Sequence, residues 1–256
     1  KGSHFISGIY NYCDRWCERC YFTSRCRVYE NLDELKPEQL DVHNKAFWES
    51  LSKNFEDAII LLHKAAEKHG IDLNNISEEE HNKYKEQDLQ TQKEIKASLP
   101  GKLTKEYSNI ADTWLKNFRS TKIFEEKLIK NFELGIESEV NTKKIVAEIK
   151  DCIEIIQWYL HFIYVKFSRA LSGKIEDDGW EEENGFQKDS DGSAKIALIS
   201  TQRSFEAWLK LFGLMPDEEE NIIPILALLQ KIKTEGEKEF PNAKNFIRPG
   251  FDTISQ

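Results

Sequence analysis

Four of the five cysteines in this 256-residue chain lie within fourteen residues, at Cys13, Cys17, Cys20 and Cys26. Thiolates are the ligands that structural zinc and iron–sulfur clusters take from proteins. The other explanation, an apolar surface that happens to use cysteine, would require four buried thiols in one short stretch. The spacing therefore predicts a metal centre near the N-terminus, held by these four side chains.

Two kinds of metal centre fit this ligand set. A [4Fe-4S] cluster takes four thiolates, and a compact single-segment set suits its small cubane. Structural zinc also takes four, but usually as two pairs from separate knuckles, and here Cys17 and Cys20 form the one such pair. We predict a [4Fe-4S] cluster, with zinc as the alternative. With each iron held by cysteine, an electron-transfer, sensing or structural role is favoured over Lewis-acid chemistry.

The last three cysteines have the spacing C-x2-C-x5-C, which is similar to the cluster loop of endonuclease III-type DNA glycosylases. The resemblance covers Cys17 to Cys26, and that family has a wider gap before its first cysteine. Leu99-Pro100-Gly101-Lys102 lacks the second glycine of a helix-hairpin-helix turn, so we infer no glycosylase activity. The C-x3-C-x2-C portion also resembles radical-SAM enzymes, but these need a β/α barrel and the chain shows no strand pattern.

Arginines are interleaved with the cysteines, and three of them, Arg15, Arg19 and Arg25, are candidates to lie beside the sulfurs. Guanidinium donors would stabilise an anionic cluster and tune its potential, while surface salt bridges are the alternative use. The fifth cysteine, Cys152, stands among isoleucines and is predicted to pack in the core.

A second metal site is a separate hypothesis. Two helical segments share an E-x6-H spacing, which places a carboxylate and an imidazole on one helix face: Glu56 with His63, and Glu154 with His161. Turned inward on two facing helices, these side chains would form a metal site in a bundle core, as in a metal-dependent enzyme. Carboxylate-bridged di-iron bundles instead use Glu-x-x-His motifs with further glutamates, so hydrogen-bonded residues at the core edge are the alternative.

The cysteines need an element that brings them together. A short helix over 8–21 is expected, and at about 100° per residue it would place Cys13, Cys17 and Cys20 within a roughly 60° arc. Cys26 would then need a turn, for which Thr23-Ser24 is the natural place because both side chains compete for backbone hydrogen bonds.

The rest of the chain reads as helix, because apolar residues recur at three- and four-residue steps. This periodicity predicts helices over 37–69, 103–119, 121–135, 142–171, 193–212 and 217–238. A very polar segment over 78–98 is expected to be either a solvated outer helix or partly disordered. Gly70 is expected to end the helix over 37–69, Ser77 with Glu80 to cap the segment over 78–98, and Pro100-Gly101 to end that segment. Residues 173–192 are expected to form a long acidic loop, with Asp191 or Ser193 capping the next helix. The predicted fold is an all-α bundle of about six to eight helices with an N-terminal Cys-rich metal-binding element.

Composition and residue order limit the possible domain organisation and cellular compartment of the protein. We expect residues 1–4 to be an expression-tag remnant, 5–32 the Cys-rich element, and 33–256 a helical bundle that forms a single domain with it. The net charge of −9 argues against a protein that coats nucleic acid. No apolar run approaches the roughly 20 residues that span a bilayer. Crowded, odd-numbered cysteines suit a reducing cytoplasm, with an unidentified protein or redox partner.

Overall fold

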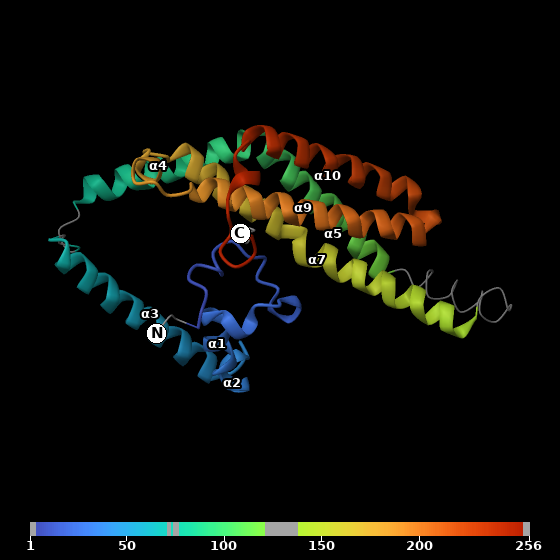
Figure 1. The fold of residues 1–256 in the computed structure, drawn as a ribbon, viewed down its shortest axis with the longest axis horizontal. Helices are drawn as coiled ribbons and strands as arrows, with labels where there is room; N and C mark the ends of the chain where they lie inside the picture. The colour runs from blue at the N-terminus through green and yellow to red at the C-terminus, as the bar shows by residue number, and fades with distance from the viewer. Residues whose placement is uncertain (1–3, 71–72, 74–76, 121–137, 253–256) are drawn as a thin grey trace. The chain divides into compact units, whose positions relative to one another are not determined.

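A computed structural model describes residues 4–70, 73, 77–120 and 138–252, and its regular elements are all helical (Figure 1). These residues hold nine α-helices, four short 3-10 helices and no strand, so the all-α prediction is confirmed for them. The expected number of six to eight is exceeded because short helices form in segments that lack a long apolar repeat. The helix expected over 121–135 lies outside the described residues.

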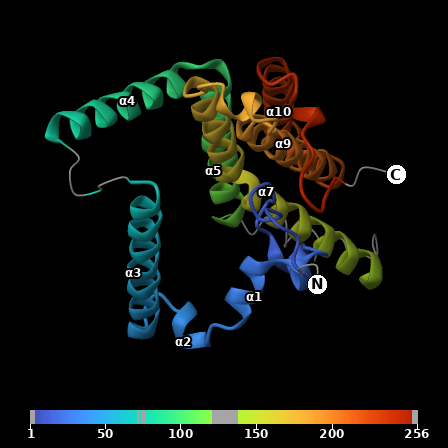
Figure 2. The same cartoon turned by 60° about the vertical axis from the view of Figure 1, so that its left-hand side comes forward.

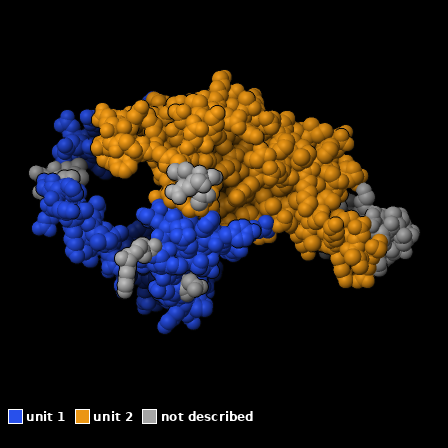
Figure 3. All heavy atoms as spheres, in the orientation of Figure 1, with its two compact units in different colours: residues 1–10, 17–90 blue, residues 11–16, 91–256 orange. Residues whose placement is uncertain are grey.

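Contacts divide the chain into two compact units (Figure 3). Unit 1 comprises residues 1–10 and 17–90, and unit 2 comprises residues 11–16 and 91–256. Each unit is described below by itself. The prediction that residues 5–256 form a single domain stays a prediction.

Unit 1 begins with an irregular segment that contains the 3-10 helices η1 and η2, and continues through four α-helices. Their bounds are η1 Cys17–Arg19, η2 Thr23–Arg25, α1 Arg27–Asp33, α2 Pro37–Leu40, α3 Lys45–Lys68 and α4 Glu78–Ala97, whose last turns belong to unit 2. Figure 2 shows α2 at the start of α3, and the two helices pack together.

The helix expected over 37–69 is interrupted between α2 and α3. The Asn44 side chain accepts a hydrogen bond from the Ala46 N–H and caps α3, while the Asp41 carboxylate accepts one from the His43 N–H. These local bonds satisfy the backbone in a turn instead of a helix. At the other end, Gly70 adopts a left-handed φ of 68° directly after α3, as expected of a residue that ends a helix.

The boundary between α4 and α5 (Leu99–Ser120) lies earlier than predicted: α4 ends at residue 97 instead of 98, and α5 begins at residue 99 instead of 103. The Ser77 hydroxyl and the Glu80 carboxylate form the predicted capping box of α4. Ser98 separates the helices, and its Oγ accepts a hydrogen bond from the Gly101 N–H at 3.1 Å. Pro100 therefore sits in the first turn of α5, where its missing N–H is harmless, and does not terminate α4.

Unit 2 is built around four helices: α5, α7 (Glu139–Ile175), α9 (Asp189–Leu214) and α10 (Glu219–Glu239). Helix α5 packs on α7, α7 on α9, α9 on α10, and α10 back on α5, so the four close a ring. Figure 1 shows them running alternately in opposite directions. The bundle prediction is therefore confirmed for unit 2.

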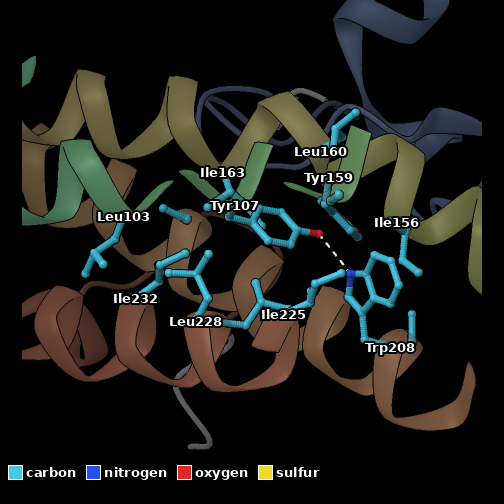
Figure 4. Close-up of a cluster of buried hydrophobic side chains, with 14 of the residues drawn as sticks. Leu103, Tyr107, Ile156, Tyr159, Leu160, Ile163, Trp208, Ile225, Leu228 and Ile232 are labelled. Atoms are coloured by element: carbon cyan, nitrogen blue, oxygen red, sulfur yellow. Dashed lines mark hydrogen bonds between the residues drawn. The ribbon is translucent and has the colours of Figure 1, made fainter. Parts of the chain in front are cut away.

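The core of the bundle contains a buried hydrogen-bonded cluster among apolar side chains (Figure 4). The Tyr107 hydroxyl accepts a hydrogen bond from Trp208 Nε1 at 3.2 Å and shares a second bond with the Ser204 hydroxyl. Burial raises the pKa of Tyr107 to about 12, although both hydrogen bonds oppose the shift. Cys152 is buried on α7, as predicted, and burial raises the pKa of its thiol.

The long acidic loop is shorter than expected. Helix α7 continues to Ile175, the short helix α8 (Trp180–Glu183) follows, and α9 already begins at Asp189. Lys188 precedes α9 without a side-chain cap, so the expected capping by Asp191 or Ser193 is wrong; both lie inside the first turns. An ion pair of 2.6 Å between Lys188 and Asp177 helps to order this connection.

The chain after α9 passes through η3 (Pro216–Glu218), α10 and η4 (Ala243–Asn245). Its end is fixed to α9, because Lys195 Nζ donates to the Phe246 carbonyl at 2.6 Å and pairs with Asp252 at 2.7 Å. None of the helices in the described part of the chain is long and apolar enough to cross a bilayer.

Candidate metal centre

The backbone around the four cysteines is irregular. Residues 7–10 form turns. Within residues 8–21, the helical residues are Cys17–Arg19, which form one 3-10 turn. The helix predicted over 8–21 and its three-thiol face are therefore wrong. Arg15 has a left-handed φ of 59°, which a right-handed helix does not accommodate. The predicted turn before Cys26 is present as η2, where the Cys26 N–H donates to the Thr23 carbonyl at 3.1 Å.

The four cysteines of the segment are half-buried, and none is in a disulfide. The Phe22 N–H donates to Cys20 Sγ at 3.4 Å, a bond that stabilises a thiolate. Across the described residues, no three Cys, His, Asp or Glu side chains are gathered as a group that could hold a metal ion. The donor set suits a metal in type and number, but its assembly is not shown and stays a prediction.

In unit 2, Asp14 anchors the residues on the C-terminal side of Cys13. Its carboxylate accepts hydrogen bonds from the Tyr159 hydroxyl at 2.7 Å, from Arg203, and from the Trp16 N–H at 3.2 Å. The Asp14 carbonyl accepts a further bond from Trp158 Nε1 at 3.0 Å. The indoles of Trp16 and Trp158 stack with centroids 4.9 Å apart and planes 13° from parallel. Hydrogen bonds and stacking thus fix this turn to α7 and α9.

Tyr12 anchors the other side of Cys13. Its hydroxyl donates to Asp189 at 2.9 Å, and Arg169 holds the same carboxylate through two guanidinium nitrogens. The Tyr12 ring packs edge-on against Phe246 at 4.5 Å. Burial and the Asp189 carboxylate raise the pKa of the Tyr12 hydroxyl well above its ordinary value. Cys13 therefore lies between two polar anchors that restrict where its backbone can move.

Cys13 and Lys166 of α7 interact electrostatically in unit 2. Lys166 of α7 has a pKa below its ordinary value, chiefly because of burial and then because of the Arg169 guanidinium. A Cys13 thiolate opposes that shift, while Arg15 adds to it. A negative charge at Cys13 would thus be stabilised by the Lys166 ammonium, on which the Asp189 carboxylate acts as well.

The arginines predicted to lie beside the sulfurs are exposed in each case. Arg25 Nε donates to the His4 carbonyl at 3.4 Å, so its guanidinium ties the start of the chain to η2. Arg27 lies over the Phe5 ring at 4.2 Å and pairs with Glu30 at 3.3 Å. The role of Arg15, Arg19 and Arg25 beside a cluster stays a prediction.

The Glu/His hypothesis is wrong about the direction of its side chains. Glu56 and His63 are exposed on α3 in unit 1, and Glu154 and His161 are exposed on α7 in unit 2. On α7 the inward positions are taken by Ile156 and other apolar side chains, because these gain more from burial than an ionisable group does. A metal site in the bundle core therefore has no support from these residues.

The chain was compared with protein-family models, curated proteins and solved structures. It matches none of them. Function is therefore inferred from the residues themselves. The sequence did not reveal that Asp14, Tyr159 and Arg203 form one hydrogen-bonded set. Tyr159 lies 145 residues and Arg203 lies 189 residues after Asp14, so no local pattern links them. The one signal in the sequence that could have indicated these anchors is that Tyr12 and Asp14, two side chains able to form hydrogen bonds, flank the candidate ligand Cys13.

Proposed function

We propose that this protein binds one [4Fe-4S] cluster through Cys13, Cys17, Cys20 and Cys26, for electron transfer, redox sensing or structural support. The observation that carries the proposal is the presence of four half-buried thiols within fourteen residues, none of them in a disulfide. Four cysteines are the usual ligand set of this cluster.

The irregular backbone supports the proposal. On a continuous helix Cys26 would lie far around from the other three thiols, whereas the chain turns at η2 just before Cys26. The Lys166 ammonium, which interacts with Cys13, would offset part of the negative charge of a thiolate-bound cluster. The Phe22 N–H bond to Cys20 Sγ is of the kind that tunes cluster potentials.

The test is metal and sulfide analysis of the anaerobically purified protein, with its absorption spectrum. We expect brown protein with about four irons and four sulfides per chain. Changing Cys17 and Cys20 to serine should remove the iron. Cys152→Ala is the matched control, because this buried thiol lies in the bundle core and its loss should leave the iron content unchanged. Iron that survives the Cys17 and Cys20 changes would refute the proposed ligands.

A zinc-stapled interaction module is the second candidate, and one observation favours it. Unit 1, which carries three of the four cysteines, also carries an exposed apolar helix of the kind that binds a protein. In this case the purified protein would be colourless and hold about one zinc per chain, lost in the same Cys17 and Cys20 variants. Protein free of both metals after purification and reconstitution would exclude both candidates.

A further inference from the structure

Helix α3 is amphipathic, yet its apolar side is exposed. Over Lys45–Lys68 the one buried residue is Ala66. The exposed large apolar side chains of α2, α3 and the turn between them are Leu40, Val42, Trp48, Phe55, Ile59, Ile60, Leu61 and Leu62. Phe55 exposes 62% of its surface and Leu62 57%. Soluble proteins rarely leave so many large apolar groups uncovered on one element, which marks an interaction surface.

The spacing along α3 identifies the kind of partner. Trp48, Leu51, Phe55, Ala58, Leu62 and Ala65 follow one another at alternating steps of three and four residues, over almost three heptads. This is the pattern of a helix that packs lengthwise against another helix. The positions that flank this stripe are uncharged between Phe47 and Ala66, whereas Glu49, Lys53, Glu56 and Asp57 lie on the other side. We call the six residues of the repeat the α3 stripe.

The α3 stripe is complementary to itself when two copies run antiparallel. Pairing about the middle of the helix sets Trp48 opposite the partner's Ala65 and Phe55 opposite the partner's Ala58, while Leu51 meets the partner's Leu62. Large side chains then face small ones in the tryptophan and phenylalanine pairs, and two leucines of equal size meet in the third pair, as close packing between helices allows. Such an arrangement has two-fold symmetry, the commonest symmetry of soluble homo-oligomers.

Charge favours a second copy over other occupants. Of the exposed large apolar side chains, Trp48, Phe55 and Leu62 belong to the stripe, and each exposes more than half of its surface. Four lysines balance three glutamates and one aspartate on α3, so the helix is neutral when histidine is uncharged. A neutral helix gains nothing from anionic lipid or nucleic acid and does not repel its own copy.

We therefore propose that this chain forms a homodimer through antiparallel pairing of the α3 stripe. The proposal is independent of the metal centre, because none of the four cysteines belongs to the stripe.

Sedimentation velocity of the full chain over a concentration series tests the proposal. We expect dimer in the wild type and monomer in Phe55→Lys and Leu62→Lys, with at least a hundredfold weaker association. Ile60→Lys is the matched control: Ile60 is 50% exposed on the same helix but lies opposite the stripe, so this variant should remain dimeric. A monomeric wild type, or a dimer that survives both stripe changes, would overturn the proposal.

Hydrogen exchange of the wild-type protein at several concentrations tests dimerisation without any variant, so the proposal can be tested even if a variant fails to fold. Amides of residues 55–66 should be protected more strongly as protein concentration rises, because association buries the stripe. Protection that is independent of concentration would contradict dimerisation. Binding of a monomer to neutral phosphatidylcholine vesicles would assign the face to a lipid surface and would likewise overturn the proposal.

Discussion

The Asp14 anchor predicts a measurable coupling between two residues far apart in the sequence. The Asp14 carboxylate accepts a bond of 2.7 Å from the Tyr159 hydroxyl, and both groups also contact Arg203. Asp14 exposes 17% of its side chain and Arg203 50%, so solvent screens the ion pair but hardly weakens the phenol bond. Burial and the Asp14 carboxylate raise the pKa of the Tyr159 hydroxyl, which keeps it a donor at neutral pH.

The magnitudes follow from these contacts. A hydrogen bond to a charged group contributes about 1.5–3 kcal/mol. Asp14→Ala removes two such bonds and a backbone cap, and with the screened ion pair discounted we expect a loss of about 2–3 kcal/mol in the free energy of unfolding of unit 2. Tyr159→Phe should lose about 1–2 kcal/mol, because the ring stays packed. The double variant should lose about 1 kcal/mol less than the sum of the single changes.

The measurement is urea unfolding of the four proteins of this double-mutant cycle, followed by tryptophan fluorescence and far-UV circular dichroism. Coincident transitions are required before free energies are compared. Tyr164→Phe is the control, since the ring of this tyrosine on the same helix faces Lys105 and its change should stay within about 0.5 kcal/mol. A coupling below about 0.3 kcal/mol would show that Asp14 and Tyr159 act independently and would refute the anchor.

Two further predictions concern unit 2. Gly192→Ala should destabilise unit 2 by about 1–3 kcal/mol, because an added Cβ would lie 2.5 Å from the Tyr12 ring and 2.6 Å from Phe246. Gly213→Ala is the control on the same helix: its added Cβ would meet nothing within 4 Å, so thermal melts should show a neutral or stabilising effect. Tyr107 has a pKa of about 12 when folded and about 10 when unfolded, so the neutral phenol favours folding and this stability is lost as pH rises from 10 to 12. Between pH 10 and 12, urea titrations should show that the free energy of unfolding of Tyr107→Phe falls by about 2–3 kcal/mol less than that of the wild type. Equal losses in the two proteins would contradict the raised pKa of Tyr107.

The regular part of the fold is predictable from local patterns. Apolar residues at three- and four-residue steps predict α5, α7 and α10, because the same repeat that makes a helix amphipathic also decides which face is buried. Ser77 with Glu80 predicts the start of α4, and isoleucines around Cys152 predict its burial. These features depend on residues that are near one another in the chain.

The candidate site is predictable in its ligands but not in its geometry. The types and spacing of Cys13, Cys17, Cys20 and Cys26 suffice to predict a metal centre, because thiol chemistry does not depend on the fold. The helical pattern over 8–21 was misleading: its aromatic and polar residues serve as anchors to α7 and α9, and no local rule shows this. Arg15, which follows Asp14, has a left-handed conformation that the helical pattern did not predict.

The sequence by itself therefore determined the all-α class, most helix positions and a set of four thiols, since each is a property of neighbouring residues. The tertiary structure decided the rest. It alone pairs Asp14 with Tyr159 and Tyr12 with Asp189, because these contacts join residues separated by 145 and 177 positions. It alone shows that the apolar side of α3 is exposed, because periodicity predicts an apolar face but not what covers it.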